Sequence, residues 1–172
     1  MADWHDLFAL LGTAAATLIG AMFVVVSIGS GFLTPERGAG IRVFLTPTIV
    51  HLSIVLFGAA LTMVPRLDGL AFGVAIAAGG ALGLIYSGRI ALHTGRHNVD
   101  TGDRLWYGVL PLIGYGLMLA AAVLMLRQTT VGLDFLALAM SFLVVAAIRN
   151  AWDMILFLIG RVGGGNRPDR GD

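Results

Sequence analysis

The chain has 172 residues, of which 58% are hydrophobic and 12% are charged, and its formal net charge is +1. Soluble domains are nearer half apolar and a quarter charged, so this composition predicts a membrane protein. The near-neutral charge gives no support to nucleic-acid binding. Because the chain has no cysteine, disulfides, thiolate metal sites and a cysteine nucleophile are excluded.

Five apolar segments are long enough to cross a bilayer, whose hydrocarbon core of ~30 Å needs roughly 20 helical residues. We expect helices at about residues 7–33, 43–64, 70–93, 105–126 and 133–161. The start, MADWHDLF, has aspartates and no arginine, so it lacks the positive region of a signal peptide. The segments predict an all-α fold with one helical domain at residues 1–162, followed by a disordered cytoplasmic tail at residues 163–172.

The arginines predict the orientation, since cytoplasmic loops carry an excess of basic residues. With the N-terminus outside, five helices place the C-terminus in the cytoplasm. The arginines outside are then Arg66 and Arg127. The cytoplasmic arginines are Arg37, Arg42, Arg89, Arg96, Arg104, Arg161, Arg167 and Arg170. We therefore expect a multi-pass protein of the inner (plasma) membrane in this orientation.

The fifth segment carries three polar side chains, Arg149, Asn150 and Asp153, within an apolar run. At ~100° per residue, all three lie on one flank of the helix. Charged residues inside membrane helices are costly, face protein or water, and often mark a functional site. We expect the rest of the chain to cover this flank.

His51 on the second segment is the other candidate in the membrane. At ~1.5 Å per residue, His51 and Asp153 each lie about 12 Å from the cytoplasmic ends of their segments, and Arg149 lies about 18 Å in. His51 and Asp153 are therefore expected at one level. Arg89 and His93 end the third segment on the same side and are secondary candidates.

Each candidate has a structural and a functional interpretation. Arg149 and Asp153 are either an ion pair that holds the bundle together or part of an ion, proton or polar-ligand site. His51 is either a hydrogen-bonded packing residue or a titrating group on a proton path. No second histidine at the depth of His51 suits haem, and zinc-site spacing is absent. We expect no cofactor and no metal.

Small residues recur at four-residue spacing on the first and third segments, for example Gly12, Ala16 and Gly20. Such spacing lets membrane helices approach closely. It predicts close packing, either within one protomer or between protomers. We therefore expect membrane lipids, a second copy of the chain or another membrane subunit as partners.

Two stretches, WHDLFALLGTAAATLIGAMFVVVSIGS at the start and IRNAWDMILFLIG near the end, resemble a group of small uncharacterised bacterial five-helix integral membrane proteins. The resemblance implies the five-helix architecture and no particular activity. It also marks a set of positions for attention, which are Trp4, His5, Gly12, Arg149, Asn150, Trp152 and Asp153.

The sequence favours a small integral membrane protein without enzymatic activity, acting as an accessory or scaffold subunit. The alternative is a homo-oligomeric channel or transporter for a proton, an ion or a small solute. Its polar path in the cytoplasmic half would be lined by His51, Arg149, Asn150 and Asp153. An intramembrane lipid enzyme is a third hypothesis, with Asp153 or His51 as its base.

Overall fold

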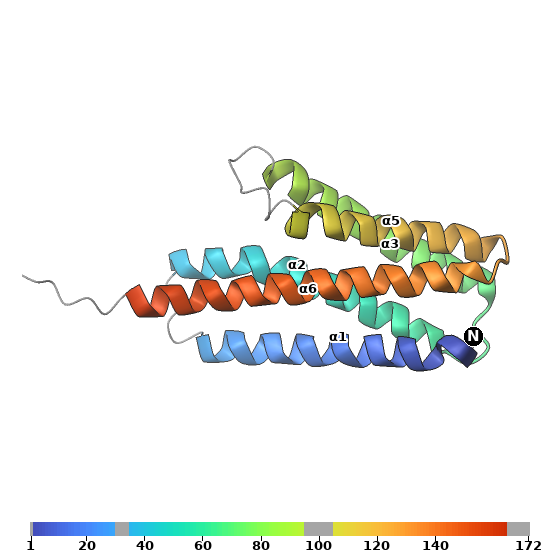
Figure 1. The fold of residues 1–172 in the computed structure, drawn as a ribbon, viewed down its shortest axis with the longest axis horizontal. Coiled ribbons are helices and arrows are strands. Elements are labelled where there is room, and N and C mark those ends of the chain that lie inside the picture. The colour runs from blue at the N-terminus through green and yellow to red at the C-terminus, as the bar shows by residue number, and fades with distance from the viewer. Residues whose placement is uncertain (1, 30–34, 95–104, 165–172) are drawn as a thin grey trace, which may run out of the picture.

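The computed structural model describes residues 2–29, 35–94 and 105–164, and within them the side chains of residues 4–27, 45–92, 106 and 108–156. Every element in these ranges is helical, which confirms the all-α fold (Figure 1). The elements are α1 (Ala2–Gly29), α2 (Pro35–Thr62), α3 (Gly69–Thr94), the π-helical turn η2 (Leu105–Val109), α5 (Leu110–Leu126) and α6 (Val131–Gly164).

Several helices begin before the expected apolar segments, because backbone hydrogen bonding continues past the apolar residues, whereas α1 and α2 end before the expected limits at residues 33 and 64. The largest difference is at α2, which begins at Pro35, eight residues before the expected start at residue 43. Proline suits the first turn of a helix, where its missing N–H has no partner to lose. Pro47 lies within α2 at a position where it cannot donate to the carbonyl of the preceding turn.

α6 is the central helix of the bundle. It packs against α5 on one side and against α2 and α1 on the other, whereas α3 packs chiefly on α5 (Figure 1). Half of the apolar stretch of α6 is buried, compared with 22% of the stretch in α1. α1 is therefore a peripheral helix with most of its surface uncovered.

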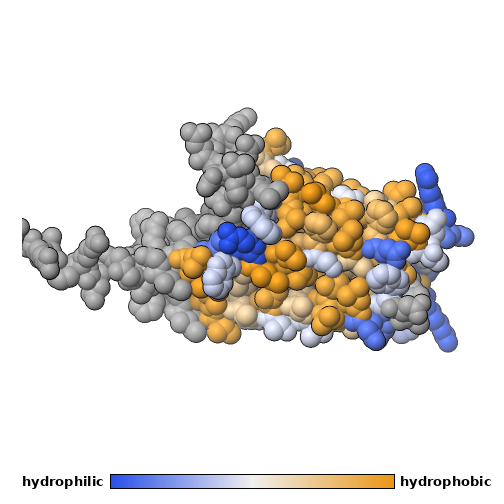
Figure 2. All heavy atoms as spheres, viewed as in Figure 1, coloured by the Kyte–Doolittle hydropathy of each residue, from blue (hydrophilic) through white to orange (hydrophobic). Residues whose placement is uncertain are grey.

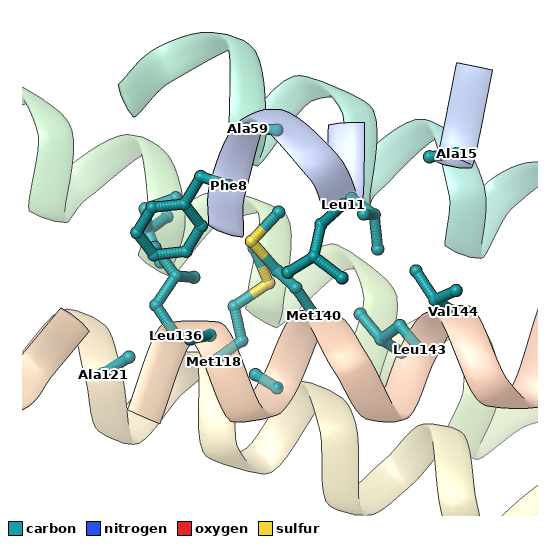
Figure 3. Packing of buried hydrophobic residues seen from close by; sticks show 14 of the residues in the cluster. Phe8, Leu11, Ala15, Ala59, Met118, Ala121, Leu136, Met140, Leu143 and Val144 are labelled. Atoms are coloured by element: carbon teal, nitrogen blue, oxygen red, sulfur yellow. The ribbon is translucent and has the colours of Figure 1, made fainter. Parts of the chain in front are cut away.

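The core is formed by large apolar side chains interleaved with alanines. Figure 3 shows Met118 of α5 and Met140 of α6 in the centre, with Phe8 and Leu11 of α1 above them. Glycine allows the closest helix approach, since a Cβ built at Gly114 of α5 would lie 2.9 Å from the side chain of Leu143. The centre of the bundle is filled by side chains.

Four helices, α1, α2, α3 and α6, are long and apolar enough to cross a membrane. α5 alone has 17 residues, which at 1.5 Å per residue is about 26 Å, less than the ~30 Å hydrocarbon core. Four of the five expected spans are thus matched by helices of sufficient length and apolar composition. Figure 2 shows a mostly hydrophobic surface along the bundle, with hydrophilic residues gathered at the end near the N-terminus.

Candidate functional site

His51 and Tyr115 form a hydrogen bond inside the bundle. Nδ1 of His51 on α2 lies 2.7 Å from the hydroxyl of Tyr115 on α5, and both side chains are fully buried. The two rings are tilted, with centroids 5.6 Å apart. Gly83 of α3 makes room for this pair, because a Cβ there would overlap the Tyr115 ring. The hydrogen bond therefore joins α2 to α5, and the Tyr115 ring packs against α3 at Gly83.

Arg149 and Asp153 form an ion pair on the flank of α6. Nη1 of Arg149 lies 2.7 Å from Oδ1 of Asp153, one turn further along the helix. The Arg149 side chain is 38% exposed and that of Asp153 is 16% exposed. Arginine before aspartate is the less favourable order at this spacing. Because both side chains are partly exposed, the pair lies at the edge of the bundle, where lipid or another protein can reach it.

An apolar groove of about 340 Å³ runs beside this ion pair. Its walls come from two elements, with Trp106 on η2 facing Val145, Ile148, Arg149 and Trp152 on α6. Trp152 is 53% exposed. Trp residues with one apolar and one polar edge are typical of the membrane–water boundary. The groove therefore has an apolar lining, to which two indole rings, two aliphatic side chains and Arg149 contribute.

Asn150 is buried beside the ion pair, at 1% exposure. Within the part of the chain that the structure describes, neither its amide oxygen nor its amide nitrogen has a hydrogen-bond partner, and the same holds for the buried hydroxyl of Ser87. Leaving such a group unpaired costs roughly 1–3 kcal/mol in proteins. Asn150 therefore has two buried polar atoms without a partner among the described residues.

The structure does not bring the four predicted site residues together in one hydrogen-bonded group. His51 is paired with Tyr115 in the interior and Arg149 with Asp153 on the flank. Asn150 is as buried as His51 and belongs to neither pair. The flank that carries Asn150 also buries Ala139 and Ala146. The structure thus covers one edge of this flank and leaves the ion pair at the other.

The secondary candidates lie towards the end of α3. Arg89 is exposed, and the backbone of His93 is helical while its side chain lies outside the described residues. Among the described residues, no group of three or more His, Cys, Asp or Glu side chains is arranged to hold a metal ion.

Tyr115, Thr48 and Ser87 are buried polar residues that the sequence analysis missed. A signal existed for Tyr115, which stands between Gly114 and Gly116 in an otherwise aliphatic run. Small neighbours of this kind provide room for a large ring to reach a facing helix. Helical periodicity gave no indication of which residue would face it.

The fold and these groups define an all-helical bundle with several helices suited to a membrane. No protein-family model matches the chain, and neither a curated protein nor a solved structure shows significant similarity to it.

Proposed function

We propose that this protein is a small integral membrane protein without enzymatic activity, which acts as an accessory or scaffold subunit beside a second membrane protein or another copy of itself. The observation that carries this proposal is the uncovered face of α1. The residues Thr13, Thr17, Gly20, Val24 and Ser27 are all exposed there. At ~100° per residue they form a stripe about 80° wide, in which Val24 is the one branched apolar side chain.

The use of small residues elsewhere in the bundle supports this interpretation. A Cβ added at Gly12 would lie 2.8 Å from Cβ of Ala59, and one at Gly73 would lie 2.9 Å from Leu126, so these glycines serve contacts within the protomer. A Cβ at Gly20 would meet nothing within 4 Å. Small and hydroxyl-bearing residues are enriched where membrane helices meet. The stripe on α1 therefore suits a helix from outside the protomer.

Gly20→Leu tests this surface without disturbing the core, because the site is open. The matched control is Gly116→Leu on α5, where an added Cβ also meets nothing within 4 Å. Native mass spectrometry of particles released from membranes should find the wild type and Gly116→Leu with a partner subunit or further copies. The Gly20→Leu particle should retain about tenfold less of this partner subunit or of these further copies. A wild-type particle with one copy and no partner would contradict the proposal.

We further propose five spans in the bacterial inner membrane, with the N-terminus outside and the C-terminus in the cytoplasm. η2 and α5 run without a break from Leu105 to Leu126, close to the roughly 20 residues a bilayer needs. α1 begins and α6 ends at opposite ends of the bundle, as an odd number of spans requires (Figure 1). The resemblance to small bacterial five-helix proteins belongs to this proposal. A reporter fused after Asp172 should show activity on the cytoplasmic side of the membrane and none on the outer side.

The buried amide of Asn150 favours a second candidate, a homo-oligomeric channel or transporter for a proton, ion or small solute. An unpaired polar group in a membrane helix is costly to keep and is often a functional group. In liposomes, flux through such a protein should fall in Asn150→Leu, Asp153→Asn and His51→Ala, and should persist in Leu82→Ala on the exposed side of α3. If all four variants had the same flux as the wild type, a path lined by these residues would be excluded.

A further inference from the structure

The buried apolar residues of α2 and α6 belong to two separate clusters. The main core extends along these helices as far as Leu52 on α2 and Ala147 on α6. A smaller group, the methionine cluster, lies closer to the end of α6. It consists of Met22, Ala151 and Met154, with Val25, Leu45 and Ile49 packed against it. The apolar interior is therefore interrupted between the main core and the methionine cluster.

Fully buried polar side chains lie at this interruption. Thr48 and His51 on α2 and Asn150 on α6 are each 1% exposed. A Cβ built at Gly58 of α2 would lie 3.7 Å from the side chain of Met140 on α6. Because the two helices run in opposite directions (Figure 1), ten residues along each helix from this contact lead to Thr48 and Asn150. Thr48, His51 and Asn150 thus form a polar layer across the contact between α2 and α6.

Both helices carry polar groups without their usual partners at this layer. The amide of Asn150 has no hydrogen-bond partner in the part of the chain that the structure describes. Pro47, next to Thr48, lies inside α2 and has no N–H, so the carbonyl of Val43 lacks its α-helical donor. Sharp bends in helices occur at proline. The contact between α2 and α6 is therefore weakest where α2 bends most easily.

The methionine cluster is a small cover over the polar layer. Leu45 precedes Pro47 and belongs to the first part of α2, whereas Leu52 follows Pro47 and belongs to the main core. Met22 and Met154 have unbranched side chains, which adapt readily to a change in their surroundings. Regions with few buried apolar contacts open at lower free energy than a core. A movement of the first part of α2 therefore separates the methionine cluster and leaves the main core intact.

We propose that the methionine cluster is a gate, which opens when the part of α2 before Pro47 moves away from α6 and admits water to Thr48, His51 and Asn150. In the open form, water supplies the hydrogen bonds that the amide of Asn150 lacks in the closed form. The gate provides an entrance for the channel or transporter of the second candidate function, and its purpose rests on that candidate. Chemical labelling measures the opening itself, whereas liposome flux measures transport.

The first experiment uses the absence of cysteine from the chain. A single cysteine is introduced as Thr48→Cys in the polar layer, and the matched control is Ala139→Cys, which is 0% exposed in the main core. A charged methanethiosulfonate reagent is added to either side of membrane vesicles. We expect Thr48→Cys to react from the side where α6 ends, about tenfold faster than Ala139→Cys, since labelling follows the population of the open form. Equal rates in the two variants would overturn the proposal.

The second experiment tests the bend at Pro47. Pro47→Ala restores the missing N–H and should slow the labelling of Thr48→Cys about tenfold, the equivalent of one hydrogen bond. Thr46→Ala, at the exposed neighbouring position of α2, should leave the rate unchanged. In the chain without an added cysteine, Pro47→Ala should also slow hydrogen exchange at the amides of residues 150–154, which lie on the opposite helix.

Unchanged labelling in the Pro47→Ala background, or unchanged exchange on α6, would overturn the bend at Pro47. Labelling and exchange as expected, in a protein that shows no flux in liposomes, would support the gate and count against the channel.

Discussion

His51 and Tyr115 join α2 to α5 through a 2.7 Å hydrogen bond between Nδ1 and the phenol oxygen, at a place where both side chains are out of contact with solvent. Polar atoms buried in this way are stabilising as a pair and destabilising when one is left alone.

Tyr115→Phe should therefore lower the free energy of unfolding by about 1–3 kcal/mol, because it strands the ring nitrogen of His51. The double variant His51→Leu/Tyr115→Phe should lose less than the sum of the two single variants. Denaturant unfolding in a mild detergent, arranged as a double-mutant cycle, measures the difference. Strict additivity would show that the bond contributes nothing.

Asp153→Leu should destabilise more than Arg149→Leu/Asp153→Leu, because the single change leaves a charge on an apolar flank without its partner. Since Arg149 is 38% exposed, the loss should be smaller than the ~3–5 kcal/mol of a fully buried pair. Thermal melts in one detergent provide the ranking. A double variant clearly less stable than Asp153→Leu would show that the two side chains stabilise the bundle by contacts other than the neutralisation of each other's charge.

Gly83→Ala should destabilise the bundle, because the new methyl group would overlap the ring of Tyr115. Overpacking of a filled core typically costs about 1–3 kcal/mol. Gly88→Ala is the matched control on the same helix, where a Cβ would meet nothing within 4 Å. The control should match or exceed the wild type, since alanine favours helix. Equal losses in both variants would point to the backbone of α3 and not to the Tyr115 contact.

Asn150→Leu should leave the free energy of unfolding unchanged or raise it by about 1–2 kcal/mol, since it removes a polar group that has no partner. The reverse change two turns earlier, Leu143→Asn, should cost several kcal/mol, because it places an amide in an apolar site. Unfolding in detergent tests both. A marked loss in Asn150→Leu would mean that the amide binds a ligand or a partner in the membrane.

The sequence was sufficient to predict the helical fold and the polar flank of α6, because apolar run length and helical periodicity depend on one segment at a time. It was not sufficient for the pairing of His51, which depends on the register between α2 and α5. Because α2 and α5 both pack on α6, that register follows from contacts with α6 such as Gly114 of α5 against Leu143, and these arise only when the helices pack.

The apolar groove between η2 and α6 could likewise not be predicted from the sequence. Trp152 stood out beside the charged residues of α6, but its companion Trp106 comes from η2, more than forty residues earlier in the chain. Pro111 contributes to this local geometry, since it has no N–H to donate within the start of α5. Segment counting gave no indication that the first turn here would be a π-helix.

The central position of α6 has a consequence for how the protein is made. α6 is the last of the described helices to emerge during synthesis, yet it supplies Leu136, Met140 and Leu143 to the core. α1 and α2 must therefore wait in the membrane with much of their eventual contact surface facing lipid. The bundle is therefore completed only when α6 packs between α2 and α5.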